Sequence, residues 1–324
     1  MMQAGSNLCA SSSLMGTTRA GKQQGMVVFP QLAAMKTTDV LQVYDAHYAA
    51  DYDNRFLLLP DIRSNTEADL TLLRGLLGPD ARWLDIGCGT GYFLSKFPGV
   101  ARAGYDLSAA MLAQARRGSP DALFFREGDF RDPVPEWEAQ WSLVTCMWSA
   151  YSYCETVKEV EQVVANMVEW TRPGGAIFIP VLDLEEMRGT SVLYHTDSAG
   201  IFPGDFWITG VTWSWAESET GKTHHHLIAP HIEHFIRLLA PHFKQVEVVS
   251  HPAVVPGGPA RRAVLATARR TGIDATRPAT VIWPTPKPVV PAAATLPLTV
   301  LLKEVVSRLR PGHLWRAVRH RLHR

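Results

Sequence analysis

The most informative part of the 324-residue sequence is an apolar run that passes into closely spaced glycines, Trp83-Leu84-Asp85-Ile86-Gly87-Cys88-Gly89-Thr90-Gly91-Tyr92-Phe93. The run at 82–86 predicts a buried strand, and residues 91–97 predict a helix. Glycines between them permit tight backbone conformations and let a ligand approach without a Cβ in the way. The first turn of the helix adds free N–H groups. The stretch therefore predicts a strand–turn–helix unit that binds a nucleotide-like ligand.

The spacing of the glycines and one acid narrow the choice of ligand. Gly87-x-Gly89-x-Gly91 differs from the dinucleotide pattern G-x-G-x-x-G. Asp85 lies two residues before the first glycine, where a carboxylate would repel a pyrophosphate but suits a ligand with ammonium and sulfonium groups. S-adenosylmethionine (SAM) has both groups, and it is the predicted cofactor.

Strand and helix patterns alternate on both sides of this unit. Strands separated by helix-length segments predict a parallel sheet with helices on both faces. The expected fold class is α/β, a doubly wound Rossmann-like sheet of seven strands, parallel with one antiparallel strand. Further strands are expected at 101–105, 122–125, 142–147, 176–182, 245–250 and 263–268, and helices at 39–52, 65–77, 108–117, 157–170 and 231–240.

Acidic and apolar residues follow the next strands of this sheet. Asp106 ends the second strand, where an acid accepts hydrogen bonds from ribose hydroxyls in nucleotide-binding folds. Asp129 follows the third strand, placed to meet an adenine amino group, with Phe130 packing on the ring. Met147 ends the fourth strand, beneath the expected position of methyl transfer. Because the carboxyl ends of parallel strands meet at one edge, we expect these residues to share one crevice.

In this order the motifs, over about residues 44–268, resemble the class I SAM-dependent methyltransferases. The resemblance is closer to sugar N-methyltransferases and glycine N-methyltransferase-like enzymes, through Tyr44-Asp45-x-x-Tyr48 and the segment at 145–150. It implies that Tyr44 or Tyr52 covers the cofactor near its methionine end, although these tyrosines would also serve to pack the first helix. The predicted cofactor-binding set is Tyr44, Tyr52, Asp85, Gly87, Cys88, Gly89, Gly91, Asp106, Leu107, Met111, Asp129, Phe130 and Met147.

Methyl transfer to an amine or hydroxyl also requires that the acceptor lose a proton. A histidine is the usual base. The candidates are His195 after the fifth strand and, on or beside an inserted hairpin, His224, His225, His226 and His231; the preferred catalytic set is His195, His226 and Tyr151 after the fourth strand. In a regular strand, His224 and His226 would face one way and His225 the other. Exposed hairpin histidines are the alternative. No metal site is expected, because no carboxylate lies within this cluster to complete one.

The chain is expected to divide into six segments. They are a disordered leader at 1–36, the SAM-binding domain at 37–190, an inserted antiparallel β-hairpin that forms a substrate lid at 191–230, a closing helix and β-hairpin at 231–272, a proline-rich linker at 273–297 and a basic amphipathic helical tail at 298–324.

Composition and motifs limit the function. The net charge of +1 argues against sequence-independent nucleic-acid binding, and the segment at 147–150 lacks the motif of enzymes that methylate exocyclic amines of bases. The main hypothesis is a cytoplasmic SAM-dependent methyltransferase acting on an N or O atom of a small metabolite, a sugar or natural-product intermediate. The alternatives are a SAM-binding scaffold recruited to a membrane or protein through the basic tail, and a SAM-dependent enzyme that does not transfer methyl.

Overall fold

The structure, a computed structural model, describes residues 37–182, 204–209, 212–217, 220–251, 261–273 and 277–284. The expected leader, the basic tail and the candidate base His195 lie outside the described residues.

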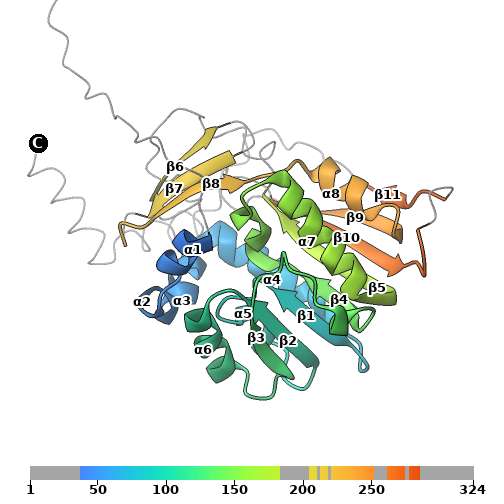
Figure 1. Ribbon diagram of the computed structural model, residues 1–324, viewed down its shortest axis with the longest axis horizontal. Coiled ribbons are helices and arrows are strands. Elements are labelled where there is room, and N and C mark those ends of the chain that lie inside the picture. The colour runs from blue at the N-terminus through green and yellow to red at the C-terminus, as the bar shows by residue number, and fades with distance from the viewer. Residues whose placement is uncertain are drawn as a thin grey trace, which may run out of the picture.

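A single large sheet of eight strands forms the centre of the fold, in the order β11-β9-β10-β5-β4-β1-β2-β3 (Figure 1). Strands β1 to β5 run parallel to one another, whereas β10 is antiparallel to both β5 and β9. The expected doubly wound α/β sheet with one reversed strand is therefore confirmed. The strands are β1 (Arg82–Ile86), β2 (Ala101–Asp106), β3 (Phe124–Glu127), β4 (Trp141–Thr145), β5 (Thr171–Val181), β9 (Phe243–His251), β10 (Arg261–Arg269) and β11 (Thr280–Ile282).

The eighth strand is a correction to the sequence analysis. β11 lies inside the segment that was interpreted as a linker, and it pairs in parallel with β9 through Val281 and Val246. Its residues Thr280, Val281 and Ile282 are β-branched and favour strands. The prolines that follow at 284–291 led to the prediction of an extended linker, and this short strand was therefore not predicted.

Helices cover both faces of the sheet (Figure 1). Alternate residues of β4 point to opposite faces: Val144 packs in the core cluster with α7 and α8, and Leu143 packs in the cluster with α4 and α5. The helices are α1 (Thr37–Val43), α2 (Ala46–Ala50), α3 (Tyr52–Leu57), α4 (Pro60–Leu76), α5 (Tyr92–Ser95), α6 (Ala109–Gly118), α7 (Val157–Trp170) and α8 (Ile232–Leu239), with 3₁₀ helices η1 (Pro135–Trp137) and η2 (Met147–Tyr153).

The N-terminal helical segment is broken where one helix was expected. Asp45 has an extended backbone, and its carboxylate accepts the N–H of Tyr48 at 2.8 Å, so it ends one helix and caps the next. The expected N-cap Ser108 is confirmed, since its hydroxyl accepts the N–H of Met111 at 3.3 Å. The break leaves Tyr44 between α1 and α2, where it faces the cleft described below.

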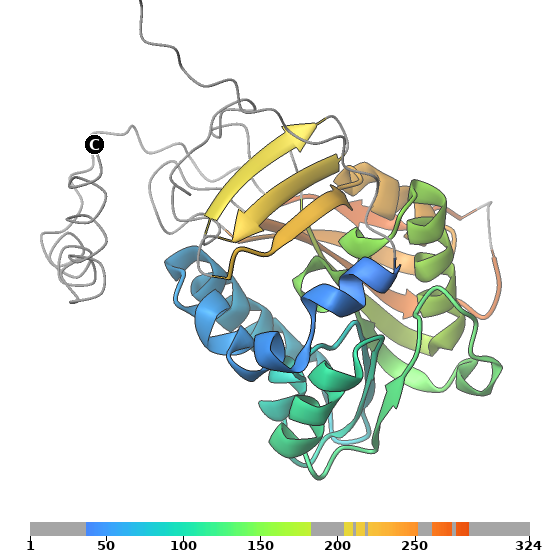
Figure 2. The same cartoon turned by 60° about the vertical axis from the view of Figure 1, so that its left-hand side comes forward.

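The inserted segment forms a separate antiparallel sheet of three strands, not a two-stranded hairpin. Its strands are β6 (Gly204–Thr209), β7 (Thr212–Glu217) and β8 (Thr223–Ile228). The alternating run that was interpreted as one strand divides between Thr209 and Thr212, which pair across the first turn. The sheet lies beside α1 and α2 (Figure 2), and Trp213 and Leu227 share a core cluster with Tyr48.

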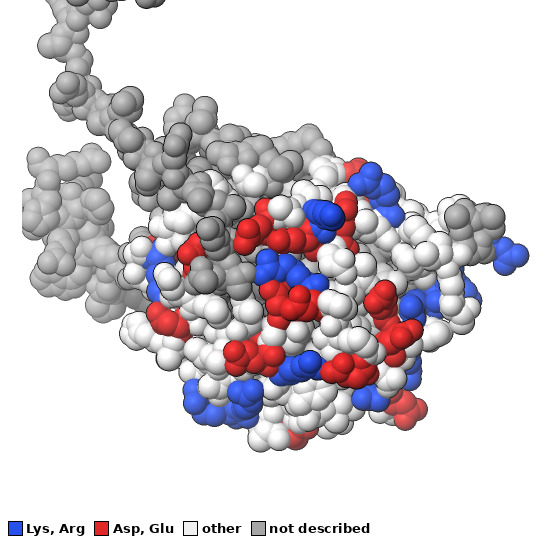
Figure 3. All heavy atoms as spheres, in the orientation of Figure 1, with Lys and Arg blue, Asp and Glu red and all other residues white. Residues whose placement is uncertain are grey.

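The described part of the chain contains no helix with the length and hydropathy that a membrane span requires. On the face drawn in Figure 3, acidic and basic side chains are interspersed, in keeping with the net charge of +1.

Candidate functional site

A left-handed glycine turn joins β1 to α5. Gly87, Gly89 and Gly91 have φ values of +61°, +53° and +71°, which side chains with a Cβ rarely adopt. The three positions face different surroundings. A Cβ on Gly87 would collide with the side chain of Ala150, and one on Gly91 would come within 2.9 Å of Ala115 on α6, whereas one on Gly89 would meet nothing within 4 Å. The turn therefore packs on its neighbours at both ends and exposes bare backbone at Gly89.

This turn forms the floor of a cleft at the carboxyl ends of the parallel strands. Its empty space is about 960 Å³, including the part open to solvent. Aromatic side chains from the N-terminal segment (Tyr44 and Tyr52), from α5 and from η2 form much of the rest of its wall. Of the predicted cofactor residues, the cleft is lined by Tyr44, Tyr52, Gly87, Cys88, Gly89, Asp106, Leu107, Met111, Asp129, Phe130 and Met147.

Asp106 at the end of β2 holds the glycine turn in place. One carboxylate oxygen accepts the N–H of Gly89 and the other accepts the N–H of Ser108, both at 2.8 Å. Burial raises the pKa of Asp106 despite these hydrogen bonds. Because each carboxylate oxygen can accept a second hydrogen bond, Asp106 can also bind a hydroxyl group of a ligand in the cleft.

Asp85 lies behind the cleft and not on its wall. The side chain is 1% exposed, and Oδ1 accepts the hydroxyl of Thr145 on β4 at 2.6 Å. Burial raises its pKa to about 7, against the lowering effect of this hydrogen bond and of one from the backbone of Met147. Direct contact between Asp85 and the cofactor was expected. The structure instead uses it to join β1 to β4 beneath the cleft, and Gly91 likewise lies behind the wall.

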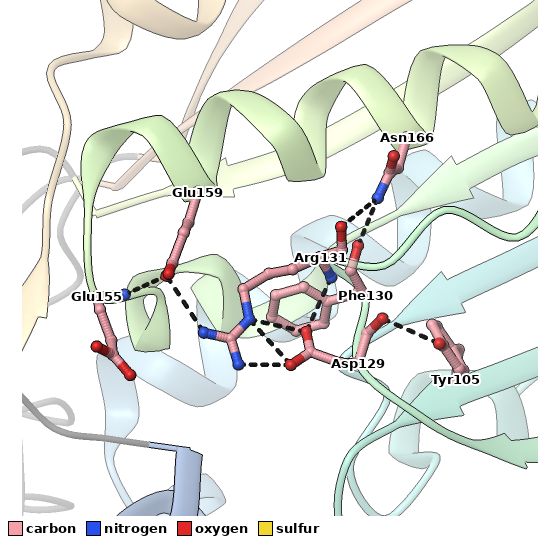
Figure 4. A network of polar contacts seen from close by, with 7 residues as sticks. All are labelled: Tyr105, Asp129, Phe130, Arg131, Glu155, Glu159 and Asn166. Atoms are coloured by element: carbon pink, nitrogen blue, oxygen red, sulfur yellow. Dashed lines mark hydrogen bonds and ion pairs between the residues drawn. The ribbon is translucent and has the colours of Figure 1, made fainter.

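The loop after β3 is fixed by a network of polar contacts (Figure 4). Both oxygens of Asp129 accept hydrogen bonds from the Arg131 guanidinium, which also contacts Glu159 of α7 at 3.2 Å. Burial acts to raise the pKa of Asp129, but the hydrogen bonds and charge of Arg131 together lower it. Asn166 donates to the carbonyl oxygens of Phe130 and Arg131 at 3.0 Å each. The Asp129 carboxylate, which was expected to meet the adenine amino group, is thus already engaged by Arg131.

Tyrosines from the N-terminal segment and η2 meet a histidine of the inserted sheet at the opposite wall. The hydroxyl groups of Tyr44 and Tyr153 are 2.5 Å apart, and the Tyr153 hydroxyl lies 2.8 Å from Nδ1 of His224. The Tyr48 hydroxyl lies 3.5 Å from Nε2 of the same ring. Tyr44 and Tyr153 line the cleft, whereas Tyr48 and His224 lie behind them.

These groups are held in their neutral forms. Burial, followed by the neighbouring tyrosines, raises the pKa of Tyr44 well above its ordinary value, and burial also raises that of Tyr153. Burial and the nearby positive charges of Lys222 and Arg55 lower the pKa of His224 to about 3. At neutral pH this wall of the cleft therefore consists of two neutral phenol groups, Tyr44 and Tyr153, with the uncharged imidazole of His224 behind them.

Comparison with known proteins agrees with this geometry. Residues 84–175 match the family model described as a methyltransferase domain. Over 153 residues the chain is 28% identical to the dTDP-4-amino-2,3,4,6-tetradeoxy-D-glucose N,N-dimethyltransferase of Saccharopolyspora spinosa, covering 47% of this chain and 57% of that protein. Over 116 residues it is 34% identical to the dTDP-3-amino-3,6-dideoxy-alpha-D-glucopyranose N,N-dimethyltransferase of Streptomyces fradiae, covering 35% and 44%. The chain carries a class I SAM-dependent methyltransferase domain.

The matches span only part of the curated relatives, 57% and 44% of the two just named. Among solved structures, DesVI of Streptomyces venezuelae is 22% identical with a TM-score of 0.47, covering 67% of this chain and 97% of that one. The sugar N-methyltransferase KedS8 from Streptoalloteichus is 18% identical with a TM-score of 0.45, covering 81% and 100%.

The residues around the cleft of the methyltransferase domain fit SAM. Gly89 leaves open space for a nucleoside to approach the backbone, and Asp106 has acceptor capacity for ribose hydroxyls. Phe130 offers a ring beside Gly87, and Tyr44, Tyr52 and Trp148 offer aromatic faces, which attract cations. The phenol groups here are neutral and carry no negative charge, so the positively charged sulfonium would be stabilised by the faces of the aromatic rings.

Two of the predicted catalytic residues, Tyr151 and His226, do not line the cleft. Tyr151 is 1% exposed, its hydroxyl accepts the N–H of Leu182 at 3.0 Å, and its ring packs on Phe235. It does not line the cleft, whereas Tyr153, two residues later in the same 3₁₀ segment, does. His226 donates its backbone N–H to the Ser214 hydroxyl and also lies away from the cleft.

His224 is the histidine that the described structure brings to the back of the cleft, and the sequence offered little to prefer it over its neighbours. Within the described residues, no group of three or more His, Cys, Asp or Glu side chains is arranged to hold a metal ion.

Proposed function

We propose that the chain transfers the methyl group of SAM to an amine nitrogen of a small-molecule acceptor of the amino-sugar type. The observation that carries this proposal is the neutral hydrogen-bonded pair Tyr44–Tyr153 at the cleft, backed by His224. The two amino-sugar relatives support the same chemistry, over about half of their length.

The choice of nitrogen over oxygen follows from the proton balance. A neutral amine already has a free lone pair and loses its extra proton only after it has been alkylated, whereas a hydroxyl group must give up its proton as it attacks. Raised pKa values keep Tyr44 and Tyr153 protonated, and the low pKa of His224 makes that ring a poor base. This wall of the cleft therefore suits an acceptor that needs orientation and no strong base.

The residues of the chain then have separate roles in the reaction. SAM, when bound, supplies a methyl group attached to a cationic sulfur. Transfer to the amine lone pair forms a carbon–nitrogen bond, breaks the bond between the methyl carbon and the sulfur, and leaves the neutral thioether. Asp106 and the backbone at Gly89 bind the nucleoside end, and the phenol oxygen of Tyr44 accepts an N–H of the amine. The rings of Tyr52 and Trp148 exclude water and bring the reacting atoms together. The proton released from the methylated amine goes to solvent.

A matched pair of acceptors tests the proposal. The protein is incubated with SAM and either dTDP-3-amino-3,6-dideoxy-glucose or the same sugar with a hydroxyl group in place of the amine, and the products are weighed by mass spectrometry. We expect a mass gain of one methylene in the amino sugar and none in its hydroxyl counterpart. Methylation of the hydroxyl sugar at a similar rate would contradict the proposal, as would a chain that binds SAM but methylates neither this compound nor other amines in a panel of amino sugars.

A further inference from the structure

The inserted sheet delivers one fully buried polar side chain to the tyrosines at the cleft. His224 on β8 is 0% exposed, and its ring lies between the hydroxyl groups of Tyr153 and Tyr48. The pairing of β7 with β8 shifts register between Trp213 and Trp215, and His226 has a φ of +50°. Such irregularities re-aim side chains beside functional sites. As a result, the side chains of His224 and His226 do not share one environment: His224 is buried, whereas His226 is half-buried.

Charged and titratable groups surround this ring on several elements. Tyr44 and Tyr48 face it from the N-terminal segment and Tyr153 from η2, with His225 beside it on β8 and Lys222 just before that strand. Arg55 of α3 adds a further positive charge and is itself paired with Glu217 of β7, at 3.5 Å. A buried imidazole among cations stays uncharged, so at any moment one ring nitrogen carries a hydrogen and the other accepts one.

The two short contacts join three groups into one chain. The distances are 2.5 Å from Tyr44 to Tyr153 and 2.8 Å from Tyr153 to Nδ1 of His224. Each phenol has a single hydrogen, so the state of Nδ1 sets the direction of both bonds. If Nδ1 accepts, the Tyr153 hydrogen points to the ring and the Tyr44 hydrogen points to Tyr153. If Nδ1 carries the hydrogen, both hydroxyl groups reverse, and Tyr44 directs its hydrogen to the cleft side, where the hydroxyl of Tyr52 also lies within hydrogen-bonding reach.

The two directions have opposite consequences for an amine. A hydroxyl hydrogen aimed into the cleft would occupy the amine lone pair that must attack the methyl carbon. A phenol oxygen with free lone pairs instead accepts an amine N–H and leaves the nitrogen lone pair free. Resting on the function proposed above, we infer that His224 is a positioning residue whose Nδ1 accepts from Tyr153, so that the Tyr44 oxygen presents a lone pair to the acceptor amine. No proton moves along this chain during the reaction.

The state of the ring can be measured on the full chain without an acceptor. Long-range proton–nitrogen NMR spectra of protein labelled with ¹⁵N-histidine distinguish the two tautomers, and comparison with the His224→Asn variant assigns the signal. We expect one imidazole that does not titrate between about pH 5 and pH 8, carries its hydrogen on Nε2, and shifts at Nδ1 in the Tyr153→Phe variant. A ring that titrates in this range, or one with its hydrogen on Nδ1, would overturn the inference.

Kinetics supply a second readout that a purely structural role would not change. With SAM and an amino-sugar acceptor, His224→Leu should lower kcat roughly 10-fold while the KM for SAM stays unchanged, because one orienting hydrogen bond is lost. His224→Asn, whose carbonyl can accept from Tyr153, should recover most of this loss. Equal rates for His224→Leu and wild type, or no recovery in His224→Asn, would refute the inference. A wild-type chain that methylates no amine would instead refute the proposed function, while the NMR result would still decide the state of His224.

Discussion

Replacing Asp85 by asparagine removes one buried ionisable group while keeping a side chain of nearly the same size. Burial raises the pKa of Asp85 from 3.8 to about 7. The folded protein therefore binds this proton more tightly than the unfolded chain does. The stability that this group contributes is therefore fully present below about pH 4 and is lost as the pH rises to about 7. At about 1.36 kcal/mol per pKa unit, the full loss is about 4 kcal/mol.

The assay is urea unfolding of wild type and Asp85→Asn at several pH values, with the difference between the two proteins as the observable. Most of the predicted loss falls in an accessible range, about 2.5 kcal/mol between about pH 5 and pH 8. The variant should therefore gain about that much relative to wild type as the pH rises, whatever constant offset the amide introduces at Thr145. A difference that stays constant within about 0.5 kcal/mol would show that Asp85 keeps an ordinary pKa, and the buried position beneath the cleft would then be wrong.

Two further pairs of variants test the wall of the cleft. Gly87→Ala should lower both stability and SAM affinity, because the new Cβ collides with the side chain of Ala150. Gly89→Ala should weaken SAM binding with a smaller stability loss, because its new Cβ meets no atom and only the left-handed backbone is strained. Thermal unfolding measures the stability and calorimetry the SAM affinity, and equal stability losses in the two variants would contradict this assignment. Tyr151→Phe should cost about 1 kcal/mol of stability and leave kcat unchanged, since its hydroxyl accepts the N–H of Leu182 and does not line the cleft. Tyr153→Phe should lower kcat several-fold, and the reverse ranking in steady-state kinetics would restore Tyr151 as the catalytic tyrosine.

The features that local sequence determines were predicted well. Buried parallel strands appear as continuous apolar runs, so β1 and β4 were visible, and Ser108 marked a helix start through its side chain. The order of acids and glycines at successive strand ends placed Asp106 and Gly89 at one crevice. These inferences depend on spacing along the chain, which a sheet with short connections preserves in space.

What sequence could not supply was the direction of individual side chains. Asp85 lies one residue before the end of β1, but its carboxylate turns to Thr145 on the neighbouring strand and away from the cleft, which depends on tertiary packing. Regular alternation placed His224 and His226 on one face, and the register shift in the inserted sheet invalidated that rule. Tyr151 and Tyr153 could not be separated either, because the left-handed backbone at Trp148 redirects the loop that holds both.

Binding of SAM in the cleft through Asp106, the acid at the end of β2, is the central claim about this protein. Calorimetric titration with S-adenosylhomocysteine, the demethylated product of SAM, tests this without any acceptor. We predict binding of about one molecule per chain, weakened at least about 10-fold in Asp106→Asn, where a charge-assisted hydrogen bond to the glycine turn is lost. The matched control Asp121→Asn, whose carboxylate binds Arg102 outside the cleft, should retain wild-type affinity. No binding by the wild-type chain, or equal affinity in Asp106→Asn and wild type, would contradict the account.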